Sequence, residues 1–185
     1  MRFLFILPLL GLLSACSDAK PKKKYISAPS LIEQQIRQVD TSLYAIKRFT
    51  TTDTLLTDTA FVHRDDFRKE VAAFLQIPDL SDPTRANAFS EETRFDELLN
   101  RAIIAYTAID PEKEPFSSIE LFIEPNPAAG DPVRTILATR RQGDRNGFEQ
   151  EQLIWQMDKS CTRILTSRKP GSAEQIKTFK WSWNE

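Results

Sequence analysis

Residues 133–168, VRTILATRRQGDRNGFEQEQLIWQMDKSCTRILTSR, decide the fold class that this sequence predicts. The segment contains three runs in which apolar and polar residues alternate, separated by a loop between Gly143 and Gly147 and by a short polar break at Lys159 and Ser160. Alternation with a period of two is typical of β-strands that bury one face. Short breaks of this kind are typical of antiparallel hairpins. These residues therefore predict an antiparallel meander.

The turns also predict a register for these strands. The first turn would set Leu137 opposite Leu153, and a tight second turn would set Trp155 opposite Ile164. Directly opposed residues of an antiparallel pair share a face of the sheet. Both pairings therefore bury Trp155 and place Cys161, interpreted as a structural thiol, on the opposite face.

The alternating pattern extends beyond these three runs on both sides. Proline and glycine residues, which interrupt ladders or form turns, separate the runs. Strands are expected at residues 102–109, 118–124, 133–141, 148–158, 162–168 and 176–183.

The first part of the sequence has a helical pattern instead. Ser30 and Glu33 have the spacing of a capping box, in which each side chain satisfies the backbone N–H of the other residue. A stripe of apolar residues follows at spacings of four and three, the period of one helix face. The stripe consists of Ile32, Ile36, Val39, Leu43 and Ile46.

Two more helices are expected before the strands. One starts near Asp65 and Asp66, whose carboxylates suit the positive end of a helix dipole, and a short one covers residues 90–99. The threonine-rich residues 50–59 are interpreted as a break. Helices followed by strands are typical of the α+β class. We therefore predict that residues 29–185 form a single α+β domain, with N-terminal helices packed on one face of a curved antiparallel meander sheet of about five to six strands.

The composition excludes some classes of partner. The chain has 185 residues, with 25 Lys and Arg against 26 Asp and Glu, so no net field attracts nucleic acid. His63 is the only histidine, and Glu120 and Glu124 lie on the solvated face of one expected strand. A single histidine does not indicate a metal site, and two carboxylates on a solvated face do not indicate a catalytic acid-base pair. The sequence predicts no catalytic residue, no metal, no cofactor and a non-enzymatic protein.

The N-terminus carries a localisation signal. Arg2 precedes an apolar run at residues 3–13 that is too short to span a bilayer, a pattern typical of secretory signal peptides. The following residues 13–16, LSAC, closely resemble the lipobox of bacterial lipoproteins. This resemblance implies a signal peptide at residues 1–15, lipidation of Cys16 and a lipidated polar tether at residues 16–28. It also implies a cell-envelope location, and Ser17 after the cysteine favours the outer over the inner membrane.

Two groups of residues are candidates for a binding surface. Phe179, Trp181 and Trp183 alternate along the last expected strand, where they could contact an apolar or glycan ligand or could belong to the core. Arg140, Arg141 and Arg145 lie in the polar hairpin at residues 139–152, which is expected to project into water. The sequence thus predicts a lipid-anchored envelope protein that binds a partner or an apolar or glycan ligand. The alternatives are an assembly lipoprotein that docks through the hairpin and, third, an envelope hydrolase.

Overall fold

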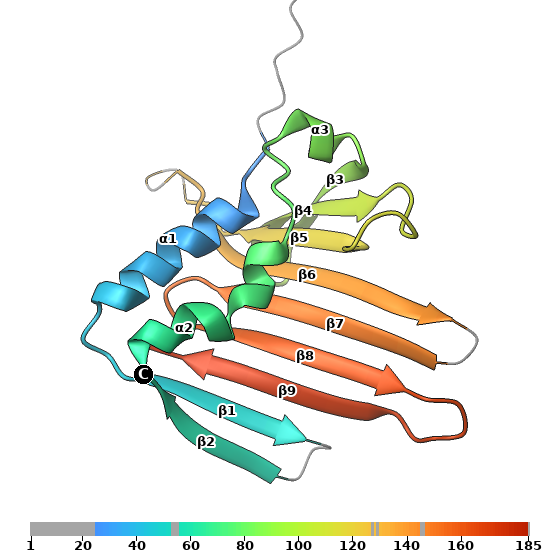
Figure 1. Ribbon diagram of the computed structural model, residues 1–185. Helices are drawn as coiled ribbons and strands as arrows, with labels where there is room; N and C mark the ends of the chain where they lie inside the picture. Colours follow the sequence, from blue (N-terminus) through green and yellow to red (C-terminus); the bar gives the residue numbers. More distant parts are fainter. Residues whose placement is uncertain (1–24, 53–55, 127, 129, 145–146, 185) are drawn as a thin grey trace, which may run out of the picture.

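About half of the described residues belong to one antiparallel β-sheet (Figure 1). The computed structural model describes residues 25–52, 56–126, 128, 130–144 and 147–184. Within these residues the sheet has nine strands, in the order β2-β1-β9-β8-β7-β6-β5-β4-β3. The strands are β1 Ile46–Thr52, β2 Leu56–Val62, β3 Phe89–Asp96, β4 Arg101–Ala108, β5 Ser118–Ile123, β6 Val133–Asp144, β7 Gly147–Gln156, β8 Ser160–Arg168 and β9 Gln175–Ser182. The helical segments are α1 Ala28–Thr41, α2 Arg64–Glu70, the 3₁₀ helix η1 Ala72–Gln76 and α3 Pro83–Ala86.

The predicted fold class is wrong. The part of the chain that the structure describes has nine strands instead of five to six, and its three α-helices are short. The helices do not precede the strands either, because β1 and β2 lie between α1 and α2, and β3 follows α3. The antiparallel pairing of the strands from residue 101 onward is confirmed.

Three strands account for the difference. Of the threonine-rich segment, residues 50–52 belong to β1 and residues 56–59 to β2, because β-branched threonine favours extended backbone. Residues 90–99 were expected to form a helix, yet most of them belong to β3, which pairs with β4 at the edge of the sheet. The glutamates of this segment suit a helix locally, but pairing with β4 supplies backbone hydrogen bonds along the whole strand.

The first helix is shorter than predicted. Its N-cap is Ser27 instead of Ser30, and the Ser27 hydroxyl accepts a hydrogen bond from the Ser30 backbone N–H at 3.3 Å. Val39 is the last residue of the predicted apolar stripe that lies in the helix. Leu43 is 98% exposed, and Ile46 is buried in β1 instead.

The predicted registers are also wrong. Trp155 lies opposite Ile136 on β6 and opposite Cys161 on β8. The first register differs from the prediction by one residue and the second by three, and an odd shift exchanges the two faces of a strand. Cys161 therefore lies on the same face as Trp155, fully buried, and Leu137 lies on the other face.

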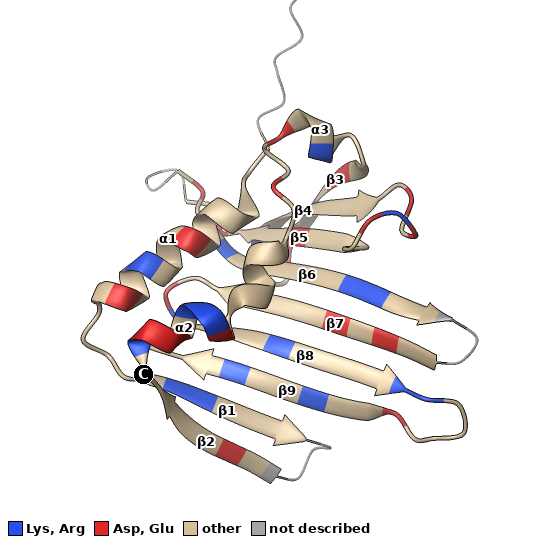
Figure 2. Cartoon of the chain, viewed as in Figure 1, with Lys and Arg blue, Asp and Glu red and all other residues tan. Residues whose placement is uncertain are grey.

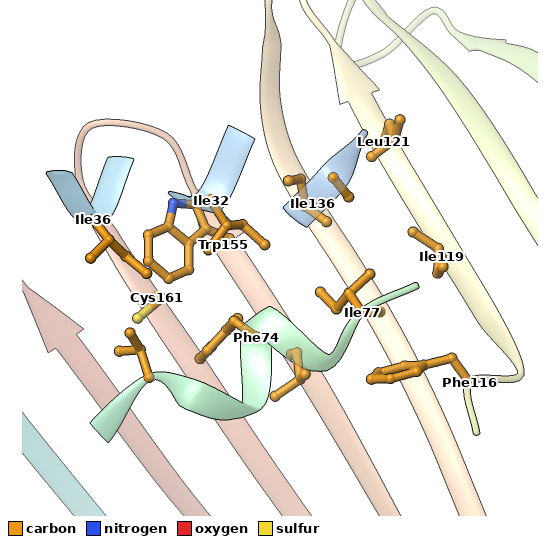
Figure 3. Close-up of a cluster of buried hydrophobic side chains, with 14 of the residues drawn as sticks. Ile32, Ile36, Phe74, Ile77, Phe116, Ile119, Leu121, Ile136, Trp155 and Cys161 are labelled. Atoms are coloured by element: carbon orange, nitrogen blue, oxygen red, sulfur yellow. The ribbon is translucent and has the colours of Figure 1, made fainter. Parts of the chain in front are cut away.

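The core joins the helical segments to the middle of the sheet (Figure 3). Trp155 is fully buried and packs edge-on against Phe74 of η1, with ring centroids 5.2 Å apart. Ile32 and Ile36 of α1 are also fully buried in this cluster. At the start of the described chain, the ring of Tyr25 lies 5.9 Å from that of Tyr106.

The two faces of the sheet differ. We call the face over which α1, α2 and η1 lie the helix-bearing face, and Trp155 and Cys161 point to it (Figures 1 and 3). Alternate residues such as Ile154 point to the opposite face, the open face, which none of the described helices covers. The helices also stop short of the far ends of β6, β7, β8 and β9, so part of the helix-bearing face stays uncovered (Figure 1).

Candidate partner-binding shelf

The uncovered part of the helix-bearing face forms a polar depression of about 380 Å³. The strand registers place Arg140, Glu151 and Leu165 side by side across β6, β7 and β8. We call this surface the shelf. The residues of the shelf that line the depression from the helix-bearing face are Arg140, Gln142, Glu149, Glu151, Arg163, Leu165 and Ser167. Figure 2 shows that basic and acidic residues alternate from strand to strand in this region.

A carboxylate beneath two guanidinium groups is the centre of the shelf. The Glu151 side chain is 5% exposed and forms ion pairs with Arg140 and Arg163. Arg163 Nε donates a hydrogen bond to Glu151 Oε1 at 2.5 Å, and Arg140 Nε lies against Glu151 Oε2. A buried carboxylate requires such partners, because an unpaired charge in the interior is strongly destabilising.

The shelf is attached to the end of the helical layer. Arg140 Nη1 donates a hydrogen bond to Oε1 of Gln76, the last residue of η1, at 3.1 Å. Its guanidinium also lies 5.8 Å from the centre of the Phe116 ring. Arg140 and Arg163 are 27% and 30% exposed, so both guanidinium groups border water while Glu151 lies below them. This arrangement can donate hydrogen bonds to a carbonyl or carboxylate of an incoming partner.

The predicted arginine cluster is divided by the structure. Arg140 lies on the shelf, whereas Arg141 points to the open face, where its Nε donates a hydrogen bond to Gln150 at 2.7 Å. Arg145 lies outside the described residues. The hairpin does not project alone, because β8 pairs with β7 as far as Phe148.

The aromatic candidates are mostly in the core. Trp181 and Trp183 are 3% and 5% exposed, and Trp181 Nε1 donates a hydrogen bond to Glu70 Oε2 at 2.6 Å. Phe179 is half-buried at the border of the shelf, opposite Arg163. The Lys177 ammonium lies 4.9 Å from its ring centre.

Sequence reasoning missed Glu151 and Arg163 as members of a site. The signal for Glu151 was present, because it lies four residues before Trp155 and so shares its face. The face of the sheet to which Arg163 points depends on the register between β7 and β8. The predicted register placed it on the wrong face.

Other reactive groups lie apart from the shelf. Burial raises the pKa of the Cys161 thiol well above its usual range, which keeps the thiol protonated. Glu120 and Glu124 form ion pairs with Arg94 and Arg134, at 3.4 and 2.6 Å.

Two kinds of feature are absent from the described residues. They contain no group of three or more His, Cys, Asp or Glu placed to hold a metal ion. No helix among them is both long and apolar enough to cross a membrane.

Comparison with known proteins provides no relative. The chain matches no protein-family model, no curated protein and no solved structure.

Proposed function

We propose that this chain is a lipid-anchored, non-enzymatic protein of the bacterial cell envelope that docks a partner protein on the shelf. The shelf carries the proposal, because it is a solvent-bordering depression with fixed arginine donors on a rigid sheet. The anchor and the envelope location are supported by residues 13–16 and their resemblance to a lipobox. Ser17 supports the outer membrane.

A protein partner fits the shelf better than an apolar ligand does. The depression is lined by charged, amide and hydroxyl-bearing residues, with Leu165 as the one aliphatic residue among its lining. The tryptophans that could have covered an apolar ligand are packed against Phe67 and Phe74 instead. Mixed polar surfaces with paired charges are typical of non-obligate protein interfaces.

Site-specific photocrosslinking in intact cells tests this function. A photoreactive amino acid at Gln142, an exposed shelf position, should give an adduct between the full chain and another envelope protein. Removal of a shelf donor, Arg140→Gln, should reduce that adduct about tenfold, because it removes charge-assisted hydrogen bonds to the partner. The matched control Arg141→Gln, the same change at the next residue of β6 on the open face, should leave it unchanged.

Three outcomes would contradict the proposal. The first is no adduct from Gln142, and the second is an adduct that Arg140→Gln and Arg141→Gln affect equally. The third is an adduct that disappears on digestion with a peptidoglycan-cleaving enzyme, which would identify a glycan ligand instead of a protein.

A further inference from the structure

The open face of the three central strands has no charged side chain over nine neighbouring positions, and Arg141 of β6 lies in the next row. We call these positions the uncharged patch. They are Thr135, Leu137 and Thr139 on β6, Gln152, Ile154 and Gln156 on β7, and Ser160, Thr162 and Ile164 on β8. Charged residues make up 28% of the chain, so about two or three would be expected among nine positions. Depletion of charge is the compositional mark of the centre of a protein interface.

The uncharged patch has charges of opposite sign on its two sides. One row of paired residues crosses the sheet from β5 to β9, in the order Glu120, Leu137, Ile154, Thr162 and Lys180. Glu120 lies two strands from β7 on one side, and Lys180 lies two strands from β7 on the other side. The neighbouring rows, from Phe122 to Ser182 and from Ser118 to Thr178, carry no charge between β5 and β9.

We propose that a second copy of this chain stacks on the open face, related by a twofold axis that runs along β7. A half-turn about that axis places β5 of one copy over β9 of the second copy. Each row of paired residues then lies over the same row of the other copy. Glu120 of each copy then lies over Lys180 of the other copy, and Ile154 meets its own equivalent. Stacked sheets lie about 10 Å apart, a distance that a glutamate and a lysine side chain can span together.

The charges distinguish this arrangement from the other symmetric one. A twofold axis across the strands would set Glu120 over Glu120 and Lys180 over Lys180, and like charges at an interface are unfavourable. A twofold interface pairs the same surface of both copies, so that surface must be complementary to itself after the rotation. The open face meets this requirement for an axis along β7, because the two sides of the uncharged patch carry opposite charges. The stack leaves the shelf free on the outside of each copy, because the shelf is on the helix-bearing face. This inference is therefore independent of the proposed function.

The test combines the mass of the full chain with charge reversal. The full-length protein, extracted in mild detergent and examined by light scattering after gel filtration, should have the mass of two chains. Glu120→Lys and Lys180→Glu should each weaken self-association at least about tenfold, because each creates two like-charge contacts by symmetry. The double variant should dimerise again. A shared detergent micelle would not produce this rescue.

Matched controls separate the interface from folding. Glu149→Lys and Lys177→Glu make the same charge changes on the helix-bearing face and should leave the dimer intact. Thermal unfolding of the single variants should stay cooperative, and this control is needed because Glu120→Lys also breaks the ion pair with Arg94 inside the chain. A monomeric wild type would overturn the inference, as would a double variant that stays as weakly associated as the single ones.

Discussion

Trp155 connects the sheet with the helical layer. Its side chain is fully buried, 5.2 Å from the ring of Phe74 on η1 and 5.5 Å from that of Trp183 after β9. Trp155→Ala would remove both ring contacts and leave a cavity, which we expect to lower the free energy of unfolding by about 3–5 kcal/mol. Glu149→Ala, an exposed position on the same strand, should change it by less than about 0.5 kcal/mol. Denaturant titration measures both values, and equal effects would show that Trp155 is not a centre of the core.

For single residues, the sequence predicts burial better than it predicts which residue lies opposite on the next strand. Alternation alone indicates that Leu153 and Trp155 are buried, and both are. The partners depend on turn length, and the turn before β8 includes Asp158 with a positive φ of 61°. Nothing in the sequence indicates that conformation, so the predicted register missed Cys161 and Arg163.

Among the elements, α1 is held by a specific polar contact as well as by its apolar stripe. Gln35 is 8% exposed, and its amide forms two hydrogen bonds with the turn between β7 and β8. Gln35 Nε2 donates to Asp158 Oδ1 at 3.0 Å, and the Asp158 backbone N–H donates to Gln35 Oε1 at 2.7 Å. A side chain on the helix therefore satisfies a backbone group of the sheet.

This contact predicts a local effect of substitution. Gln35→Ala should destabilise the fold by about 1–3 kcal/mol, because it removes both hydrogen bonds to Asp158, each of which contributes about 0.5–1.5 kcal/mol. Hydrogen exchange of the α1 amides should become faster in this variant. Gln34→Ala provides the same change on the exposed side of the helix and should have little effect. Equal exchange in both variants would contradict an anchoring role for Gln35.

The elements that the sequence failed to predict are those whose conformation depends on distant partners. Residues 90–93 have a local pattern that suits the start of a helix, but β4 and its ladder decide the outcome. In contrast, β4 to β9 alternate clearly, and the structure confirms strands there. On the shelf, Arg140 was identified from the sequence, whereas its partner Glu151 was assigned to an exposed ribbon. The structure places that carboxylate beneath two guanidinium groups.

For the whole molecule, the sequence predicts attachment to a membrane through Cys16. Cys16→Ser removes the thiol that the lipobox resemblance identifies as the lipid acceptor. We expect this variant to be released from membranes or to remain as an unprocessed precursor, since lipid chains give the stable anchor. Fractionation after a carbonate wash, with the wild-type chain as control, measures the change. A cleaved variant that still sediments with membranes would contradict the prediction.

The position of β9 between β1 and β8 has a consequence for folding order. A ribosome produces β1 and β2 early, but the strand that connects them to the rest of the sheet is the last to be made. The hairpin of β1 and β2 must therefore wait for residues 175–182 before it can join. Contacts that span nearly the whole chain make such closure slow. A chain that lost its last ten residues would lose β9 and, with it, the attachment of its first two strands.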